Sequence, residues 1–288
     1  ILFAVGNELD RYTGIEFSPV TVAKLRQALI RQPLTADIDI VEAEATNLSD
    51  VVETSYDTAV LNSTVQYFPN IGYLIEVLRK ALGRLADDGR IFLGDLRSPE
   101  LLMLTRIWIE YSRADASTSI HELRRRVRNS NDHEWELLIS PQLIDDSHLH
   151  IDGIAWGESS VHHGRGLNEM IRFRYDATLH RTPPSKTVTP HWQQWVPEIS
   201  VGDMRAAVRA IETSSAIGWY GVANARLWRE RLLLDAMNEA PARTIEQVLG
   251  EPVACRGIDP ADLFDLGVEL SRDIRVTWTR GRADGSVD

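Results

Sequence analysis

The chain has 288 residues, 43% of them hydrophobic and 25% charged, with a formal net charge of −11. This acidic balance argues against a protein that mainly grips nucleic-acid phosphates, and no run approaches the ~18 apolar residues of a membrane helix. The single cysteine, Cys255, excludes an intramolecular disulfide and a thiolate zinc site. The single cysteine predicts a reducing, cytoplasmic setting. Residues 1–6 also lack the basic flank of a signal peptide.

The first hundred residues predict strands that alternate with helices, after a short helix that ends at Gly6. We expect strands at 11–17, 37–43, 56–62 and 90–95, helices at 20–31 and 71–85, and a turn at 87–89. This alternation is typical of a doubly wound α/β sheet, here mostly parallel.

The pattern changes after Ser98. We expect helices at 101–110, 116–128, 201–238 (with a break at 218–223) and 259–270, and strands at 169–180, 274–278 and 287. Residues 145–153 are predicted as a loop and 182–185 as a linker. These later strands make the predicted sheet mixed.

Each predicted strand of the first part is followed by a polar residue: Glu16, Asn47, Asn62 with Ser63, and Asp95. In open α/β sheets the ligand lies outside the carboxyl ends of the strands. Polar residues also follow strands simply because loops are polar. Four in succession favour a small-molecule crevice.

Several segments are similar to the methyltransferase domains embedded in nonribosomal peptide synthetases. Residues 59–69 (AVLNSTVQYFP) resemble the "VLNSVVQYFP" segment of that family, and 92–98 (FLGDLRS) resemble its "GDVRS" strand end. Residues 168–176 resemble "NELTRFRYD", 221–227 resemble "GVPNARL", and 285–288 are similar to the last strand. The matches lie in family order.

The resemblance implies a class I (Rossmann-like) methyltransferase, with a mostly parallel sheet, antiparallel final strands and a helical extension. Residues 1–180 would form the core, and 181–288 would supply the extension and final strands of the same domain. In the family a glycine-rich loop after the first strand holds the methionine end of the cofactor. Residues 1–18 resemble the segment that follows this loop, so we expect the first strand and the loop to lie upstream of residue 1.

The resemblance also implies an activity. The family uses S-adenosylmethionine (SAM) to methylate the α-amine of an aminoacyl thioester on a carrier protein, from within an adenylation domain. The implied partners are the carrier protein, the adenylation domain and an MbtH-like protein. Methylation of side-chain oxygen, sulfur or carbon is an alternative activity. A non-catalytic scaffold with a degenerate cofactor site is an alternative of a different class.

Six residues are candidates for cofactor binding. Glu16 lies where class I folds place a carboxylate that accepts both ribose hydroxyls, and Phe17 would lie near the adenine unless it packs in the core. Asn47 stands where the family commonly has Asp, and its amide oxygen can accept from the adenine amino group. Asn62, Ser63 and Gln66 would flank the cofactor, or else cap a helix.

Methyl transfer needs a neutral acceptor amine held ~3–3.5 Å from the methyl group. A carboxylate or phenol can orient the amine and take its proton. Asp95 is the first candidate, and Tyr67, Glu169 and Tyr175 are the others. The candidates for substrate binding come from two motifs: Arg97, Asn168, Arg172, Arg174 and Tyr175. Arg172, Arg174 and Asp176 would share a strand face as a structural network, or contact substrate.

Two other patterns favour ordinary interpretations. The histidines lack zinc-helix spacing, so no metal site is predicted. The basic run at 121–128 is typical of a solvated helix face, with a docking patch for an acidic carrier protein as the alternative.

Overall fold

The computed structural model describes residues 1–48, 55–130, 134–185, 188–212, 214–239, 242–251, 257–278 and 283–288. Cys255 lies outside the described residues. The strands are β1 (Arg11–Glu16), β2 (Asp37–Glu42), β3 (Tyr56–Asn62), β4 (Leu85–Arg97), β5 (Trp156–Val161), β6 (Arg174–His180), β7 (His191–Gln194) and β8 (Ile217–Tyr220).

The α-helices are α1 (Leu2–Val5), α2 (Pro19–Arg31), α4 (Ile71–Leu82), α5 (Leu102–Ser112), α6 (Ile120–Ser130), α7 (Pro141–Asp145), α8 (Glu169–Phe173), α9 (Val201–Ala210), α10 (Trp228–Glu239), α11 (Ile245–Leu249) and α12 (Pro260–Leu270). Short 3₁₀ turns are η1 (Ala45–Asn47), η2 (Val65–Tyr67), η4 (Ser147–Leu149) and η5 (Ala225–Leu227).

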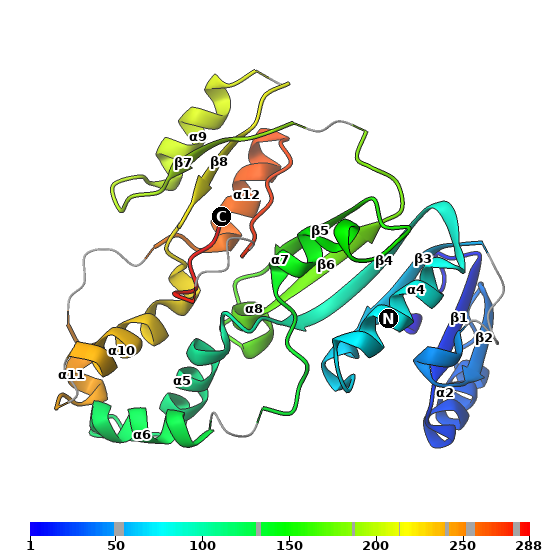
Figure 1. Ribbon diagram of the computed structural model, residues 1–288, viewed down its shortest axis with the longest axis horizontal. Helices are drawn as coiled ribbons and strands as arrows, with labels where there is room; N and C mark the ends of the chain where they lie inside the picture. The colour runs from blue at the N-terminus through cyan, green and yellow to red at the C-terminus, as the bar shows by residue number, and fades with distance from the viewer. Residues whose placement is uncertain are drawn as a thin grey trace.

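The strands form three sheets (Figure 1). The largest has the order β3-β4-β6-β5, with β3 parallel to β4 and with β6 antiparallel to both β4 and β5. The parallel pair β1-β2 and the parallel pair β7-β8 lie apart from it. The predicted mixed α/β sheet is confirmed, but its antiparallel strand is β6, which runs against β3, β4 and β5, and the last residues of the chain do not form one of its strands.

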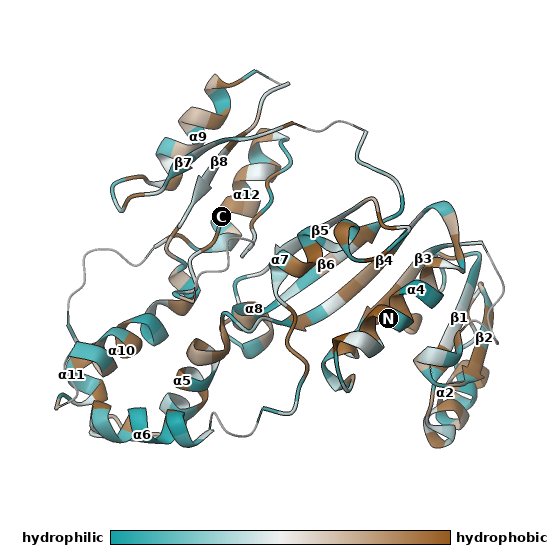
Figure 2. Ribbon diagram, viewed as in Figure 1, coloured by the Kyte–Doolittle hydropathy of each residue, from teal (hydrophilic) through white to brown (hydrophobic). Residues whose placement is uncertain are grey.

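Helix α4 illustrates how the first part folds. The Asn70 side chain caps it by accepting from the Tyr73 N–H at 3.0 Å. One face then buries five apolar residues against the sheet: Leu74, Val77, Leu78, Ala81 and Leu82. Figure 2 shows hydrophobic residues along β4 and α4, and hydrophilic residues over α6. The helix ends at Leu82, earlier than predicted, because Leu85 already pairs with Tyr56.

Four predictions of local structure are wrong. The turn expected at 87–89 lies inside β4, where the register against β3 shifts between Tyr56 and Thr58. Residues 169–173 are helical, because Asn168 caps them by accepting from the Ile171 N–H. The helical stretch expected over 201–238 is divided into α9 and α10; its predicted break at 218–223 overlaps a strand, β8, which was not predicted. Residues 274–278 are not a strand, although Val276 and Thr277 make backbone bonds to Val161 and Asp288.

Two hydrophobic clusters stabilise these layers. A small one joins Leu2, Val22 and Ile40 around β1, β2 and α2. The large one runs from Val65 to Val287, so the later part of the chain shares a core with the four-stranded sheet. Within the ranges that the structure describes, no helix is both long and apolar enough to span a membrane.

Candidate functional site

Polar residues gather where the parallel strands end, as the sequence predicts. Glu16 pairs with Glu42 at the ends of β1 and β2, and Asn62 pairs with Gly94 where β3 runs beside β4. The Ser63 N–H donates to the Gly94 carbonyl at 3.1 Å. The sheet therefore brings Asn62 and Ser63 beside the β4 segment that contains Asp95.

The backbone is strained at this position. Ser63 and Asp95 have φ values of 54° and 65°, in the left-handed region that non-glycine residues adopt rarely. Such conformations persist only where the surroundings hold them, and they concentrate at functional sites. Their coincidence on neighbouring strands marks this edge of the sheet as the candidate active site.

The Asp95 carboxyl is buried, with 5% of the residue exposed. Its Oδ1 accepts no hydrogen bond from the described residues, and the nearest cation is Arg174, whose Nε lies 3.8 Å away. A buried polar atom without a hydrogen bond is costly and needs an explanation. A ligand donor that is present only when substrate binds would satisfy it.

Arg174 connects Asp95 to a larger network. Its Nη2 donates to Glu169 Oε1 at 2.6 Å, and its Nη1 lies 3.8 Å from Glu136 Oε2. Arg97 donates to Glu136 and to Glu134 at 3.0 and 2.8 Å. Asp95 and Glu169, two of the predicted catalytic residues, are thus brought together by one guanidinium group.

The residues predicted to bind cofactor fit the group they are expected to hold. Glu16 Oε1 accepts from the Ser18 N–H at 2.8 Å, while Oε2 accepts nothing from the described residues. Phe17 is 74% exposed, which excludes the core-packing alternative. Gln66 is buried, and its Oε1 lacks a partner within the described ranges. Asn47 ends η1, directly after β2.

Several predicted substrate residues have structural roles instead. The Tyr175 hydroxyl donates to the Ile139 carbonyl at 2.7 Å, and burial, ahead of the charges of Glu100 and Asp145, raises its pKa well above the ordinary value. Arg172 donates to the Arg226 carbonyl and to the fully buried Glu230. Both side chains are buried and bonded within the protein, which gives them structural contacts, and their binding of substrate stays a prediction. Asn168 caps α8.

The two remaining candidates differ in exposure. Arg97 is mostly buried and bonded to two carboxylates, so its charge is already compensated. Tyr67 ends η2 and is 73% exposed. The structure leaves its phenol at the surface, next in sequence to the buried Gln66.

The sequence did not point to Glu134, Glu136 or His162, and it left Asp176 either in a structural network or in contact with substrate. The acidic pair has one signal, the alternation Glu134-Trp135-Glu136, which places both carboxylates on one side of an extended segment. His162 Nε2 lies 2.9 Å from Asp176 Oδ1. No sequence pattern marks that contact, because it depends on the pairing of β5 with β6.

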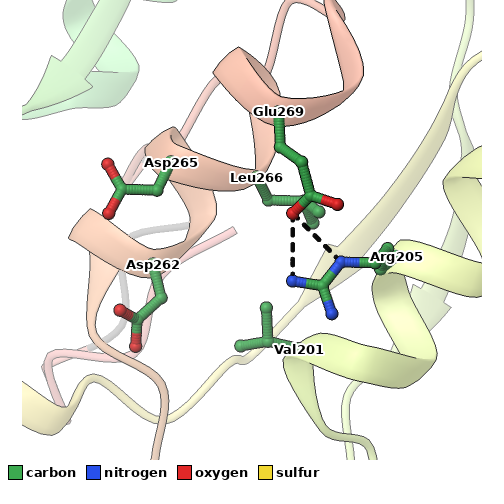
Figure 3. A pocket seen from close by; sticks show the side chains of 6 residues that line it. All are labelled: Val201, Arg205, Asp262, Asp265, Leu266 and Glu269. Carbon is green, nitrogen blue, oxygen red and sulfur yellow. Dashed lines mark hydrogen bonds and ion pairs between the residues drawn. The ribbon is translucent and has the colours of Figure 1, made fainter.

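A pocket of about 230 Å³ lies elsewhere, between α9 and α12 (Figure 3). Arg205 reaches from α9 to Glu269 of α12 at 3.1 Å. The other two carboxylates that line it, Asp262 and Asp265, pair with Arg165 at 2.8 and 2.5 Å. These acids are neutralised by arginines, so the pocket offers no reactive group.

The basic run forms much of α6, and its charges are partly paired within the helix. Arg125 and Arg126 donate to Glu122 at 2.7 and 3.0 Å, and these bonds lower the pKa of Glu122 to about 2. Arg124 donates to the Met237 carbonyl. This helix therefore has the features of a solvated, self-paired face. Over the described ranges, no group of three or more His, Cys, Asp or Glu residues could hold a metal ion.

Gly94 is required by the close approach of Asn62. A Cβ at Gly94 would lie 2.1 Å from Asn62 Oδ1 and 2.8 Å from a Phe92 ring atom. We expect Gly94→Ala to displace the Asn62 amide and to lower the free energy of unfolding by about 1–3 kcal/mol, measured by urea denaturation.

Gly83→Ala is the matched control, because its nearest atoms lie at 3.5 and 3.8 Å and its φ is −66°. This variant should be at least as stable as the wild type. Equal stability of the Gly94 and Gly83 variants would show that Asn62 moves without cost.

The chain is similar to parts of much longer proteins. It is 28% identical over 294 residues to chondramide synthase of Chondromyces crocatus, and 28% over 309 residues to a nonribosomal peptide synthetase of Emericella nidulans. It is 26% identical over 302 residues to the PF 1022-synthetase of a Rosellinia species. These matches cover 97–100% of this chain but only 8%, 12% and 9% of the relatives.

Solved structures give weaker matches. A SAM-dependent methyltransferase from Methanosarcina mazei has a TM-score of 0.40 at 13% identity, over 62% of this chain and 86% of that one. An N-methyltransferase from Bradyrhizobium japonicum, crystallised with S-adenosylhomocysteine, has a TM-score of 0.35 at 13% identity, over 59% and 66%.

Residues 2–93 match a family model described as a methyltransferase domain. This range contains β1, β2, β3 and most of β4, and it ends two residues before Asp95. The sequence motifs, the parallel pairings β1-β2 and β3-β4, and the similarity of the whole chain to segments of peptide synthetases agree with this match. Residues 2–93 thus carry a methyltransferase-family sequence, and the whole chain is similar to segments of nonribosomal peptide synthetases.

Proposed function

We propose that the domain methylates the α-amine of an aminoacyl group held as a thioester on a carrier protein. The observation that carries the proposal is the buried Asp95 carboxyl, which has an oxygen without a hydrogen bond and lies near Glu169 through their shared contact with Arg174. Two carboxyl groups near one point suit an amine, since an amine has N–H groups to donate.

When bound, SAM supplies a methyl group activated by its sulfonium sulfur. Asp95 would accept a hydrogen bond from an N–H of the amine and so direct the lone pair of the amine nitrogen at the methyl group. The carboxylate would also take a proton from the amine, directly or through water. Arg174 keeps the neighbouring carboxylates from repelling one another. The strained backbone of Asp95 fixes the direction of its carboxyl.

We propose that six residues at the strand ends hold SAM. Glu16 would accept from the ribose hydroxyls through Oε2 and Phe17 would lie against the adenine, with Asn47 accepting from its amino group. Asn62, Ser63 and Gln66 would line the side nearer Asp95. The open Oε2 of Glu16 and the exposed ring of Phe17 support this assignment.

Glu16→Ala is expected to weaken SAM binding by roughly 1–3 kcal/mol, because a buried ribose would lose a charged acceptor. The measurement is calorimetric titration with SAM. Glu42→Ala is the matched control, since Glu42 ends the neighbouring strand in register with Glu16. Equal affinity of the Glu16 variant and the wild type would remove Glu16 from the site.

We also propose that residues 1–180 and 181–288 fold as one domain. The large hydrophobic cluster, which runs from Val65 to Val287, supports this proposal, because the later part of the chain shares a core with the four-stranded sheet.

The proposed partners follow from the setting. An adenylation domain in the same polypeptide would load the amino acid, and a carrier protein would present it on phosphopantetheine. The similar proteins are named as a synthase and two synthetases, which supports this setting. An MbtH-like partner has no support among the comparisons.

The test is transfer of a methyl group to an aminoacyl carrier protein, followed by intact-protein mass and fragmentation of the released amino acid. A 14-dalton gain on the α-nitrogen supports the proposal. A methyl group on a side-chain oxygen, sulfur or carbon would favour the alternative activity. Absence of both SAM binding and transfer in the full-length polypeptide would favour a non-catalytic scaffold.

A further inference from the structure

The β4-β6 ladder contains a bulge at the active site. Leu93 pairs with Ala177 and Leu96 pairs with Tyr175, so Gly94 and Asp95 together face the single residue Asp176. A bulge of this kind leaves one residue without ladder bonds and re-aims its side chain. Asp95, with its φ of 65°, occupies that position.

The Asp176 side chain takes the place of the missing ladder bond. Its Oδ1 accepts from the Asp95 N–H at 3.0 Å. Without this acceptor, the N–H of a nearly buried residue would lose its partner in the described structure, and the left-handed conformation would lose its restraint. The contact acts on the backbone of Asp95 and leaves the carboxyl free to face a ligand.

His162 holds Asp176 in turn. Its Nε2 lies 2.9 Å from the same Oδ1, and the side chain is only 15% exposed. The His162 carbonyl accepts from Arg226 Nη1 at 2.8 Å, and Arg226 Nη2 donates to the Gly164 carbonyl at 2.7 Å. The segment that carries His162 is thereby fixed to the rest of the domain.

We infer that Asp176, oriented by His162, is a positioning residue that holds the bulge at Asp95 and so aims the Asp95 carboxyl at the acceptor. The inference rests on the proposed catalytic role of Asp95. Asp176 and His162 would act through Asp95, without contacting substrate or cofactor themselves.

The test compares two substitutions of Asp176 in the full-length polypeptide. Asp176→Ala removes the acceptor and should lower kcat about 10- to 100-fold, with the KM for SAM unchanged. Asp176→Asn keeps Oδ1 and should restore kcat to within about threefold of the wild type. Thr178→Ala, on the same strand and opposite Phe92, is the control and should leave kcat unchanged.

His162 provides a second pair of variants in case Asp176→Ala folds poorly. His162→Phe keeps a ring but removes Nε2, and should lower kcat about 3- to 10-fold. His162→Gln can present its amide nitrogen near the same point and should recover most of that loss. The double variant Asp176→Ala/His162→Phe should be no slower than Asp176→Ala, because both residues act through one contact.

Hydrogen exchange gives a readout that needs no turnover. The peptide covering residues 92–98 should lose the protection of one amide in Asp176→Ala and regain it in Asp176→Asn. Wild-type kcat and protection in Asp176→Ala, or an Asp176→Asn variant as slow as Asp176→Ala, would overturn the inference. A wild-type product methylated on another atom would instead overturn the proposed function.

Discussion

Asp95→Asn is expected to lower the rate of methyl transfer roughly 10²- to 10⁴-fold while SAM affinity stays nearly unchanged. The amide keeps the size of the carboxyl group but cannot take a proton from the acceptor amine. Because Asp95 is buried beside Arg174 and Glu169, water cannot easily replace it as the base. The rate is measured at saturating SAM by intact mass of the aminoacyl carrier protein.

The pH dependence separates a base from a merely structural residue. A carrier-bound α-amine has a pKa of about 8, so much of it is already neutral at pH ~9. The Asn variant should therefore recover part of its activity between pH ~6.5 and ~9. Asp88→Asn, an exposed residue of the same strand, is the control and should match the wild type throughout. An Asp95→Asn variant as active as the wild type at every pH would direct attention to Tyr67 or Glu169.

The sequence predicts the part of the site that depends on strand ends. Asn62 ends β3 and Asp95 lies near the end of β4, and parallel neighbours bring such ends to one edge, whereas Glu16 ends β1 in a separate sheet. This is why β1, β2, β3 and the end of β4 were predicted closely, and why Asp95 was the first candidate for catalysis. Nothing in these segments needed knowledge of distant contacts.

The rest of the site depends on register and tertiary packing. Asp176 holds Asp95 only because the β4-β6 ladder contains one extra residue on β4, and a bulge has no pattern in β6 alone. Residues 169–173 alternate as a strand would, yet the Asn168 cap makes them helical. Where a capping residue precedes a segment, alternation of apolar and polar residues does not decide between a strand and a helix.

Arg172 shows that a residue of a family motif can have a structural role. Its position in the family-like segment favoured substrate binding, but its guanidinium pairs with Glu230, which is fully buried in α10, and also donates to the Arg226 carbonyl at 2.9 Å. This contact ties α8, beside the active site, to α10.

Arg172→Leu is expected to lower the free energy of unfolding by roughly 3–5 kcal/mol, because it leaves the Glu230 carboxylate buried without a compensating charge. The other oxygen, Oε1, already lacks a hydrogen bond from the described residues, so little else can stabilise that carboxylate. The measurement is urea denaturation followed by tryptophan fluorescence, with midpoints and slopes compared between variants.

The double variant Arg172→Leu/Glu230→Leu distinguishes loss of a charge partner from loss of packing. Replacing both members of a buried pair by apolar groups is often close to neutral, so the double variant should be more stable than Arg172→Leu alone. Arg125→Leu is the surface control: its partner Glu122 is in solvent contact, and no resolvable change is expected. If the double variant were as unstable as Arg172→Leu, the cost would lie in the shape and hydrogen bonds of the arginine. The charge of Glu230 would then be excluded as the reason that Arg172 is required.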